Sequence, residues 1–446
     1  MQLSNLPTVG RTDAEFYQPK FLKFDDLARS TGQRLGNLFS EIIQPTEFIR
    51  QYAPAGTGAQ FWRAQNVRRG YVDIDDVECV DWATFQQVHK SHVREGDVLI
   101  TRTGANAGDC AVVPPGTQNV AVSSHTLRLV PKDIEMGYAV GVFFASDYGR
   151  DILLRAVSGS SRPQITKEVL QSIFLPDFGP IKADLAELMR AFYREREHAE
   201  TLYAEAETLL LAKLALDDLD LSHQPTYTQS YSQAWASGRW DAEYFHPEKW
   251  QALEQLDAIP GKTVDNYFLS VRQLLNPPER DTGEMVYNYD LTDALRFFLD
   301  DDVKLVSTYE LGSTKKRFQS GDVVVSRLRS YLKEIAIVAA SGSANCVGSS
   351  EFIVLRAKTK TVSPELLLVY LRCSLVQRVL KWCQDGSNHP RFRESELLNL
   401  KLPDRILGIQ GDINRLIQDS IQVHRDARRL LEEAKQRVEE MVLGKE

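Results

Sequence analysis

Apolar residues are spaced as in an amphipathic helix in two long stretches of the chain. Both stretches are flanked by glutamate, arginine and lysine, and the second lies 228 residues after the first. Alternating steps of three and four residues are typical of a helix that buries one narrow stripe. We therefore expect two helices of about 34 residues that pair as an antiparallel coiled coil. The stripe positions are Leu185, Leu188, Phe192, Ala199, Leu202, Ala206 and Leu209, then Ile413, Leu416, Ser420, Ala427, Leu430, Ala434 and Arg437, with Val438 beside the last.

The segment before each of these helices mixes strand and helix patterns. "GDVLITR" after Glu95 and "GDVVVSR" after Ser320 are turn residues followed by β-branched runs, which favour strands. Residues 137–157 and 364–383 carry apolar residues at helical spacing. A Gly-Ser loop and a short segment that ends at a proline follow each of these helices. The pattern predicts an α+β protein with two similar mixed α/β domains separated by the two long helices.

The same order of predicted strands and helices occurs twice along the chain. "DAEFYQP" at Asp13 returns as "DAEYFHP" at Asp241, an offset of 228. The "GDV" strands repeat at an offset of 225, and "GSSRPQIT" at Gly159 returns as "GSNHPRFR" at Gly386, an offset of 227. Small loop insertions and deletions explain this drift, so we interpret the chain as a tandem duplication with an internal pseudo-twofold repeat. The expected domains are a first mixed domain at 1–180, a spacer helix at 181–218, a linker at 219–238, a second mixed domain at 239–405 and a second spacer helix at 406–446.

The composition is that of a soluble globular protein. With 446 residues and a hydrophobic content of 43%, the chain is long enough for two or three folded domains. No apolar run approaches the roughly 20 residues that span a bilayer, and the first residues lack the features of a signal peptide. The five cysteines are scattered without a CxxC pair, as expected of reduced thiols. We therefore expect a cytoplasmic protein with no membrane contact.

Charge is segregated along the chain, whose formal net charge is −8. Residues 183–218 carry nine acidic and four basic residues, a net charge of −5, and residues 279–302 have a net charge of −6. Residues 315–334 carry six basic and two acidic residues, a net charge of +4. Because nucleic-acid binding depends on neutralising phosphates, the basic segment favours a role in DNA contact, and the acidic helix favours contact with protein partners.

The doubled layout resembles the specificity subunit of type I restriction–modification enzymes, over essentially the whole chain. The resemblance rests on the two Asp-Ala-Glu openings, "FWRAQNVRRG" at Phe61, the paired "GDV" strands, the Gly-Ser-x-x-Pro loops and the helices after Pro176 and Pro403. No single motif is specific, but their doubled order is. In that family each mixed domain is a target recognition domain that reads one half of a split, asymmetric DNA site. The helices hold the two domains apart and dock methyltransferase subunits.

The resemblance implies a non-catalytic chain that acts through partners. Those partners are double-stranded DNA, methyltransferase (modification) subunits and endonuclease/translocase (restriction) subunits. S-adenosylmethionine, ATP and Mg2+ are then expected in the partner subunits, for N6-adenine methylation and ATP-driven translocation with cleavage, and no cofactor is expected in this chain. A helix of about 34 residues spans roughly 50 Å, enough to hold readers of half-sites about 34–36 Å apart. The alternative is a DNA-recognition or scaffold subunit of another phage-defence complex.

The candidate DNA contacts follow the repeated strands and the Gly-Ser loops. Arginine can form two parallel hydrogen bonds to guanine or to phosphate, and glutamine can do so to adenine. Tyrosine can stack on a base or bind phosphate. A solvated surface loop is the alternative interpretation for each residue, and Trp62 fits a core position better than a contact. The doubled phrase at Asp13 and Asp241 indicates a shared structural task, such as tethering each domain to the helices. The candidates are Arg68, Arg69, Arg102, Thr103, Arg162, Gln164 and Lys167 in the first half, and Arg327, Arg329, Tyr331, Lys333, His389, Arg391 and Arg393 in the second.

Catalytic signatures are incomplete in this sequence. "NPPE" at Asn276 has Glu279 where the motif of adenine methyltransferases has an aromatic residue. "PGKT" at Pro260 lacks the upstream glycine of a phosphate-binding loop, because Leu256 occupies that position. The eight histidines form no metal-ligand spacing with acidic residues. We therefore expect no catalysis by this chain alone, and a pure protein scaffold or a stand-alone nuclease or methyltransferase are the competing classes.

Overall fold

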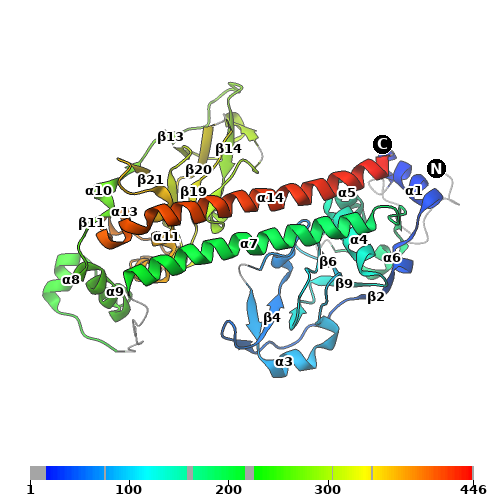
Figure 1. Ribbon diagram of the computed structural model, residues 1–446, viewed down its shortest axis with the longest axis horizontal. Coiled ribbons are helices and arrows are strands. Elements are labelled where there is room, and N and C mark those ends of the chain that lie inside the picture. Colours follow the sequence, from blue (N-terminus) through cyan, green and yellow to red (C-terminus); the bar gives the residue numbers. More distant parts are fainter. Residues whose placement is uncertain are drawn as a thin grey trace. The chain divides into compact units, whose positions relative to one another are not determined.

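The chain folds into two compact units. The computed structural model describes residues 17–74, 77–157, 164–215, 226–303, 305–342 and 345–443. Unit 1 comprises Met1–Glu197 and Val423–Glu446, and unit 2 comprises His198–Gln422. Each unit therefore contains one mixed domain and part of both long helices (Figure 1).

Unit 1 is built on two four-stranded sheets. The first sheet is antiparallel with the order β2-β9-β6-β7, and the second has the order β3-β5-β4-β8 with one parallel pair, β4 with β8. Helix α4 packs on the first sheet and α5 packs on α4. The elements are α1 Pro19–Thr31, β1 Gln33–Arg34, α2 Leu35–Leu38, β2 Phe39–Ile43, β3 Tyr52–Ala53, β4 Ala59–Trp62, η3 Ala64–Asn66, β5 Glu78–Val80, α3 Trp82–Gln87, η4 His89–Ser91, β6 Val98–Thr101, β7 Cys110–Val112, β8 Val120–Val122, β9 Thr126–Pro131, α4 Ile134–Ala145, α5 Asp147–Ala156, α6 Lys167–Ser172 and β10 Phe174–Leu175.

Unit 2 repeats this plan with two five-stranded sheets. Their orders are β12-β21-β18-β19-β15 and β13-β17-β20-β14-β16, and the pair β14 with β20 is parallel like its counterpart in unit 1. The elements are α8 Tyr231–Ser237, η5 Glu243–Phe245, α9 Pro247–Ala258, β11 Gly261–Thr263, α10 Val264–Tyr267, β12 Phe268–Val271, β13 Leu274–Leu275, β14 Met285–Tyr289, η6 Leu291–Leu295, β15 Phe298–Leu299, β16 Leu305–Ser307, η7 Thr308–Glu310, β17 Lys315–Phe318, β18 Val323–Ser326, η8 Ser330–Leu332, β19 Ile335–Val338, β20 Asn345–Ser349, β21 Phe352–Ala357, α11 Pro364–Arg372, α12 Ser374–Trp382, α13 Glu394–Leu398, β22 Lys401–Pro403 and η9 Asp404–Ile409.

Local sequence explains why the helices begin where they do. Pro19 and Pro247, the prolines of the doubled phrase, occupy the first turn of α1 and α9, where a missing N–H costs nothing. The hydroxyl of Ser146 accepts from the N–H of Gly149 at 3.1 Å and caps α5. Ser363 caps α11 in the same way. The proline in each copy of the phrase therefore has a structural cause.

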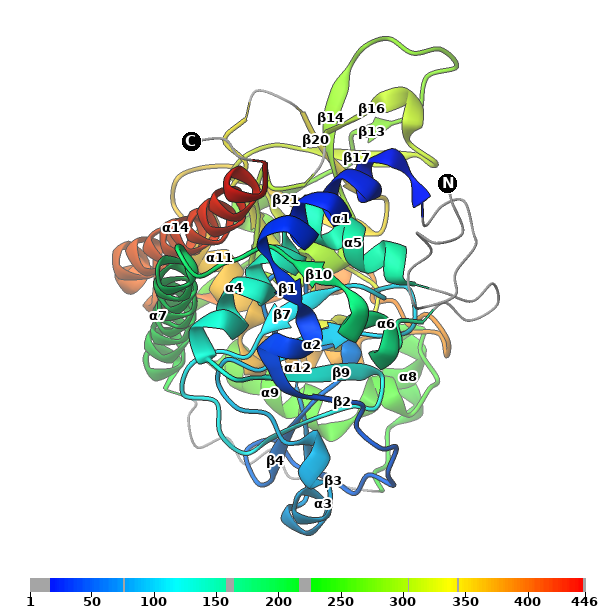
Figure 2. The same ribbon diagram turned by 90° about the vertical axis from the view of Figure 1, so that its right-hand side faces the viewer.

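A two-stranded ribbon closes each mixed domain. In unit 1 β1 pairs antiparallel with β10, with Gln33 opposite Leu175 (Figure 2). In unit 2 β11 pairs with β22, with Gly261 opposite Pro403. Gln33 and Gly261 are 228 residues apart, and so are Leu175 and Pro403. This distance is the offset of the sequence repeat. A Cβ on Gly261 would lie 2.3 Å from a carbonyl oxygen of the partner strand, so the close approach of the backbones requires glycine there.

Equivalent ion pairs, each with a buried aspartate, support the two domain cores. In unit 1 Arg128 on β9 pairs with Asp97 at 2.6 Å, and both side chains are buried. In unit 2 Arg356 on β21 pairs with the buried Asp322 at 2.7 Å. Each aspartate immediately precedes a fully buried strand, β6 or β18. Together with the matching sheets and ribbons, these pairs confirm the doubled α+β fold.

The long helices α7 (Lys182–Leu214) and α14 (Gln410–Leu443) pack together within each unit. In unit 1 the first turns of α7 share a core with the last turns of α14, through Leu185 and Val438 among others. In unit 2 the last turns of α7 share a core with the first turns of α14, as with Leu214 and Ile413. The pairing is antiparallel, which confirms the sequence prediction.

The buried stripe of these helices is wider than the predicted one. Within each unit, the parts of the two long helices contact one another and also the core of the mixed domain. A broader face of each helix is therefore buried than in an isolated coiled coil. Within the predicted spans 181–218 and 406–446 the structure describes α7 and, after η9, α14, while residues 216–225 and 444–446 lie outside the described residues. Four predicted stripe positions are only half-buried beside a fully buried neighbour: Leu188 beside Met189, Leu209 beside Leu210, Leu416 beside Ile417, and Leu430 beside Leu431.

The described part of the chain contains no helix that is both long and apolar enough to cross a membrane. All five cysteines are buried and none is paired in a disulfide.

Candidate nucleic-acid interface

Three candidates of unit 1 meet at one point, which we call the unit 1 junction. The backbone N–H of Arg102, directly after β6, donates to the carbonyl oxygen of His125 at 2.9 Å, and the Arg102 carbonyl accepts from Ile165 at 3.0 Å. An Nη of Arg102 donates to Oε1 of Gln164 at 2.8 Å, and Oγ1 of Thr103 lies 3.0 Å from Nδ1 of His125. The structure therefore brings Arg102, Thr103 and Gln164 together from segments about 60 residues apart.

Unit 2 builds the same junction around a carboxylate. The N–H of Arg327, directly after β18, donates to the carbonyl oxygen of Glu351 at 3.2 Å, and the Arg327 carbonyl accepts from Phe392 at 3.1 Å. Arg391 donates Nη2 and Nε to the Glu351 carboxylate at 2.8 and 3.1 Å, and Arg327 donates Nε to it at 2.7 Å. These hydrogen bonds, those of Arg391 above all, lower the pKa of Glu351 to about 2. The carboxylate is therefore ionised at neutral pH and holds both guanidinium groups.

The two junctions occupy equivalent positions of the repeat but carry different side chains. Their backbone hydrogen bonds are the same in pattern, and an isolated β-bridge joins the same two segments in each unit, Thr103 with Gln164 and Leu328 with Arg391. The scaffold is thus shared, whereas the groups that it presents are Arg, His and Gln in one unit and Arg, Glu and Arg in the other. The equivalent residues are Arg102 and Arg327, His125 and Glu351, and Gln164 and Arg391.

The two arginines of the unit 2 junction differ in how many of their guanidinium nitrogens are already hydrogen-bonded. Arg391 also donates Nη1 to the carbonyl oxygen of His389 at 3.0 Å, so all three of its guanidinium nitrogens are engaged. Arg327 engages only Nε among the described residues, and its side chain is 45% exposed. A guanidinium fixed at Nε and open at both Nη groups can donate two parallel hydrogen bonds to guanine O6 and N7 or to a phosphate. Arg327 therefore has the geometry of a reader, and Arg391 that of a positioning residue.

A tight turn beside the unit 2 junction presents further candidates. Arg329 and Lys333 both adopt positive φ angles, 49° and 54°, which are uncommon for residues other than glycine and concentrate at functional sites. Arg329 is held by the segment 388–390, donating its N–H to the carbonyl oxygen of Pro390 at 2.9 Å. The turn between them exposes Tyr331, at 56%. The candidates that are exposed around this turn are Tyr331, Lys333, His389 and Arg393.

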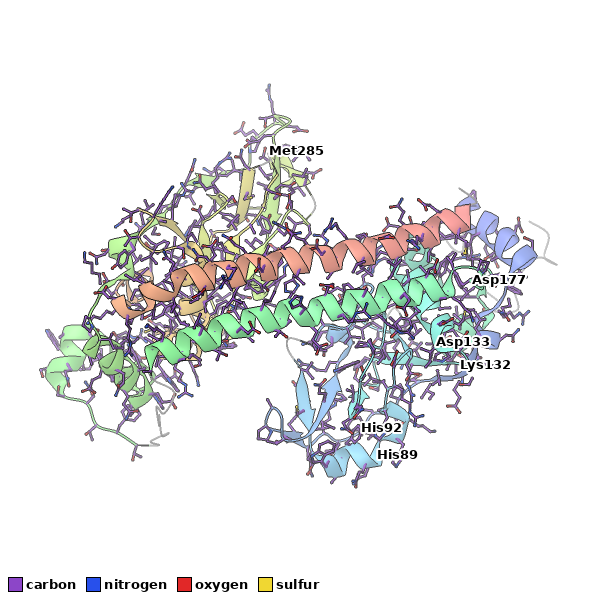
Figure 3. All side chains as sticks on the ribbon, viewed as in Figure 1. His89, His92, Lys132, Asp133, Asp177 and Met285 are labelled. Carbon is purple, nitrogen blue, oxygen red and sulfur yellow. The ribbon has the colours of Figure 1, made fainter. Side chains whose placement is uncertain are left out.

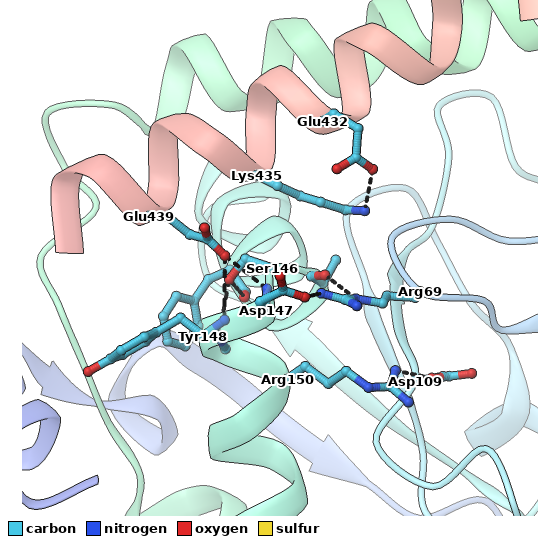
Figure 4. Close-up of polar contacts among 12 residues, drawn as sticks. Arg69, Asp109, Ser146, Asp147, Tyr148, Arg150, Glu432, Lys435 and Glu439 are labelled. Atoms are coloured by element: carbon cyan, nitrogen blue, oxygen red, sulfur yellow. Dashed lines mark hydrogen bonds and ion pairs between the residues drawn. The ribbon is translucent and has the colours of Figure 1, made fainter. Parts of the chain in front are cut away.

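Arg68 and Arg69 lie in a different environment from the junction. Arg69 donates Nε to the carbonyl oxygen of Ala145 at 2.7 Å and pairs with Asp147 at the start of α5 (Figure 4). Glu439 of α14 accepts from the N–H of Asp147 at 2.9 Å, so these contacts fasten α14 to the mixed domain of unit 1. Arg68 pairs with Asp73 at 3.4 Å. Such contacts are structural, and a DNA contact by either arginine stays a prediction.

The other candidates of unit 1 are dispersed. Lys167 is the exposed first residue of α6 and lines a cavity of about 540 Å³ with Lys90, Gln171 and strand β2. Trp62 is buried, and its Nε1 donates to Gln60 at 3.0 Å, as a core position requires. Arg162 lies outside the described residues.

The second copy of the Asp-Ala-Glu phrase has a structural role. Arg239, which precedes it, is buried, forms a two-pronged ion pair with Asp241 at 2.6 and 2.7 Å, and donates to the carbonyl oxygen of Gln384 at 2.8 Å. The second copy of the phrase is therefore attached, through Arg239, to the end of α12. The sequence had suggested attachment to the long helices instead. The first copy, around Asp13, lies outside the described residues.

The motifs that resemble catalytic signatures have structural explanations. Gly261–Thr263 of "PGKT" form strand β11, so these residues make no phosphate-binding loop. His92 stacks on Phe85 with ring centroids 3.9 Å apart and lies beside His89 (Figure 3). No cluster of three or more His, Cys, Asp or Glu suited to a metal ion occurs among the residues that the structure describes.

Sequence reasoning missed the central residue of the unit 2 junction. Glu351 is not among the candidates named from the sequence. The signal was nonetheless present, since an offset of 226 aligns Glu351 with His125 between two candidate loops. A residue pair that differs at an otherwise shared position of a duplicated scaffold is a candidate for specificity.

No protein-family model matches this chain, and no curated protein does either. Three solved structures are similar to it over most of their length. The S subunit of a type I restriction–modification system from M. genitalium is 12% identical, with a TM-score of 0.41 and coverage of 92% of this chain and 94% of that one. The HsdS subunit from Thermoanaerobacter tengcongensis is 14% identical, with a TM-score of 0.27 and coverage of 93% and 97%. A chain from a study of complex assembly and conformational transition of the type I R-M system is 15% identical, with a TM-score of 0.27 and coverage of 91% and 96%.

The descriptions of these structures name the family that the doubled motifs resemble. TM-scores below 0.5 at identities of 12 to 15% measure a distant likeness of fold. The case for function therefore comes from the residues of this chain.

Proposed function

We propose that this chain is the DNA-recognition subunit of a type I restriction–modification complex. Each unit reads one half of a bipartite, asymmetric site, and the chain itself carries out no chemistry. Methyltransferase subunits dock on the long helices and supply S-adenosylmethionine-dependent methylation of adenine, while restriction subunits supply the ATP- and Mg2+-dependent steps.

The pair of junctions is the observation that carries this proposal. The same backbone framework presents Arg102 with Gln164 in unit 1 and Arg327 beside Glu351 in unit 2. A duplicated scaffold with exchanged hydrogen-bonding groups is what two different half-sites require, since specificity is read from the edges of the bases. A protein that bound only other proteins would not require arginine side chains at equivalent positions of both units.

The charge distribution supports a division of labour with partners. The overall net charge of −8 gives little general attraction to DNA, so affinity depends on local basic groups and on the partner subunits. The exposed faces of α7 carry acidic residues in both units, such as Glu187 in unit 1 and Glu205 in unit 2. These faces suit protein partners and repel phosphates.

The test is a map of methylated adenines. Co-expression of the chain with its methyltransferase subunit in a methylation-deficient host should produce N6-methyladenine within one split, asymmetric sequence, which sequencing of the genomic DNA reports. Arg102→Ala should relax or abolish recognition of one half of that sequence, and Arg327→Ala should do so for the other half. Arg378→Ala on α12, an exposed arginine outside both the junctions and the long helices, is the matched control and should leave the target unchanged.

Three outcomes would count against the proposal. A palindromic or continuous target would contradict two different readers. Both substitutions affecting the same half would contradict the assignment of one half to each unit. Specific DNA binding without any methylation would instead favour a recognition subunit of another phage-defence complex.

A further inference from the structure

Ile49 is the most exposed of the large apolar side chains that project from the described surface, at 91%. It lies in unit 1, on the loop between β2 and β3. An isoleucine in that position gives up the favourable burial that its side chain would have in a core. Its exposure therefore needs an explanation.

The loop around Ile49 is braced on its N-terminal side. The carboxylate of Glu47 accepts hydrogen bonds from the hydroxyl of Ser124 and from the guanidinium of Arg50. Ser124 belongs to the turn between β8 and β9, so this contact ties the loop to the strands of the unit 1 sheets.

Aromatic contacts fix the residues on both sides of Ile49. Phe48 packs edge-on against the buried Phe61, with ring centroids 5.6 Å apart. The guanidinium of Arg50 lies 5.2 Å from the centroid of Phe61 and 5.7 Å from that of Phe48. With both neighbours anchored inward, Ile49 projects outward from a held loop, and its β-branched side chain is itself stiff.

The braced loop is connected directly to the unit 1 junction. Ser124, which holds Glu47, is followed by His125, and the carbonyl oxygen of His125 accepts from the N–H of Arg102. The side chain of His125 also contacts Thr103. The loop that carries Ile49 and the candidate reader Arg102 therefore both contact the turn at residues 123–125.

We propose that Ile49 inserts as an apolar wedge at a base step next to the bases read by the unit 1 junction. This inference rests on the proposed function and adds a residue that distorts the DNA. Proteins that unstack a base step use apolar side chains such as isoleucine for it, because the wedge replaces base stacking with apolar contact. The resulting deformation favours flexible steps, so Ile49 contributes specificity without any hydrogen bond to a base.

Among its described residues unit 2 has no exposed isoleucine. Its most exposed apolar side chains near the corresponding loop, Leu274 and Met285, lie on strands β13 and β14 (Figure 3). The loop between those strands is polar, "NPPERDTGE". The distortion is therefore confined to the half-site that unit 1 reads.

The experiment uses the assembled complex of this chain with its methyltransferase subunit. Duplexes that contain the mapped target carry 2-aminopurine at successive positions of each half-site, and the fluorescence of this base analogue rises when it unstacks. We expect a several-fold rise at one step of the half-site read by unit 1, loss of that rise with Ile49→Ala, and partial rescue with Ile49→Leu. Ile134→Ala is the matched control, an exposed isoleucine at the start of α4 in the same unit, and should keep the rise.

The outcomes separate this inference from the proposed function. Specific binding with no fluorescence rise in either half-site, or a rise that Ile49→Ala leaves intact, overturns the wedge and leaves the proposed function standing. Absence of any specific target overturns the proposed function itself. If Ile49→Ala weakens co-purification of the methyltransferase subunit while the fluorescence rise is unchanged, the residue is a protein contact and the wedge is wrong.

Discussion

The carboxylate of Glu351 makes a quantitative prediction because it joins two arginines from different segments. Glu351→Gln keeps the shape of the side chain, removes its charge and turns an amide NH2 toward guanidinium donors. The pKa of Glu351 falls from 4.5 to about 2 in the folded protein. At about 1.4 kcal/mol per unit, that difference of about 2.5 units corresponds to an upper limit of about 3.4 kcal/mol. The paired arginines are 41% and 45% exposed, so solvent screening reduces the expected contribution to about 1 kcal/mol.

The direction of the pH dependence follows from the lowered pKa. A carboxylate whose pKa is lower in the folded state contributes stability above its unfolded pKa and loses that contribution as the pH falls toward its folded pKa. The wild-type protein should therefore be more stable than Glu351→Gln at neutral pH. The difference should shrink as the pH falls from 4.5 toward about 2.

Urea unfolding of the full chain at about pH 7 and about pH 3.5 measures this difference. Glu310→Gln is the control, because Glu310 is exposed and makes no ion pair within the described part of unit 2. Equal stability of Glu351→Gln and wild type at neutral pH would refute the electrostatic role. So would a difference that stays the same at the lower pH, since that pattern indicates a packing effect.

Other buried polar groups give further predictions. Asp97→Ala leaves Arg128 buried without its partner, so it should destabilise unit 1 by about 3–5 kcal/mol and lower the urea midpoint. Lys249 is 1% exposed and burial lowers its pKa, so the folded protein disfavours the charged form and gains stability as the pH rises. Lys249→Met should therefore match or exceed the wild type in melting temperature at neutral pH, with a smaller advantage at alkaline pH; a lower melting temperature throughout would contradict this. Ser420→Ala removes the hydrogen bond to the Ala199 carbonyl at 2.7 Å and should cost about 1 kcal/mol in urea unfolding, whereas an unchanged midpoint would show that the bond contributes little.

The sequence was most informative about the helices and strands that occur in both halves of the duplicated chain. The ribbon pairing of Gln33 with Leu175 and of Gly261 with Pro403 follows the offset of 228 that the opening phrases already showed. A duplicated pattern can be checked against its own copy, so strands and helices that are ambiguous in one copy become clear in the pair. The fold class and the long helices were predictable for this reason.

The sequence was least informative about which polar side chains meet. Arg69 and Arg102 look alike in the sequence as loop arginines, yet Arg69 donates to the carbonyl oxygen of Ala145 and Arg102 to Gln164. Their partners lie 76 and 62 residues away in the chain. A choice between such distant partners depends on tertiary packing, which local patterns do not encode.

The same limit applies to the helix stripes. Spacing alone assigned Leu416 to the buried face, and the structure buries Ile417 instead. The two residues are equally apolar, so only the position of the neighbouring domain decides between them.

The closing ribbons carry an evolutionary consequence. In each unit the chain enters and leaves the mixed domain at two neighbouring strands that are paired by backbone hydrogen bonds, β1 with β10 and β11 with β22. A graft cut at residues 33 and 175, or at 261 and 403, would join the backbone at one short ribbon, and the incoming domain would have to keep the apolar face that packs on the long helices. Under the proposed function, exchange of one mixed domain would change one half of the target while the long helices stay the same.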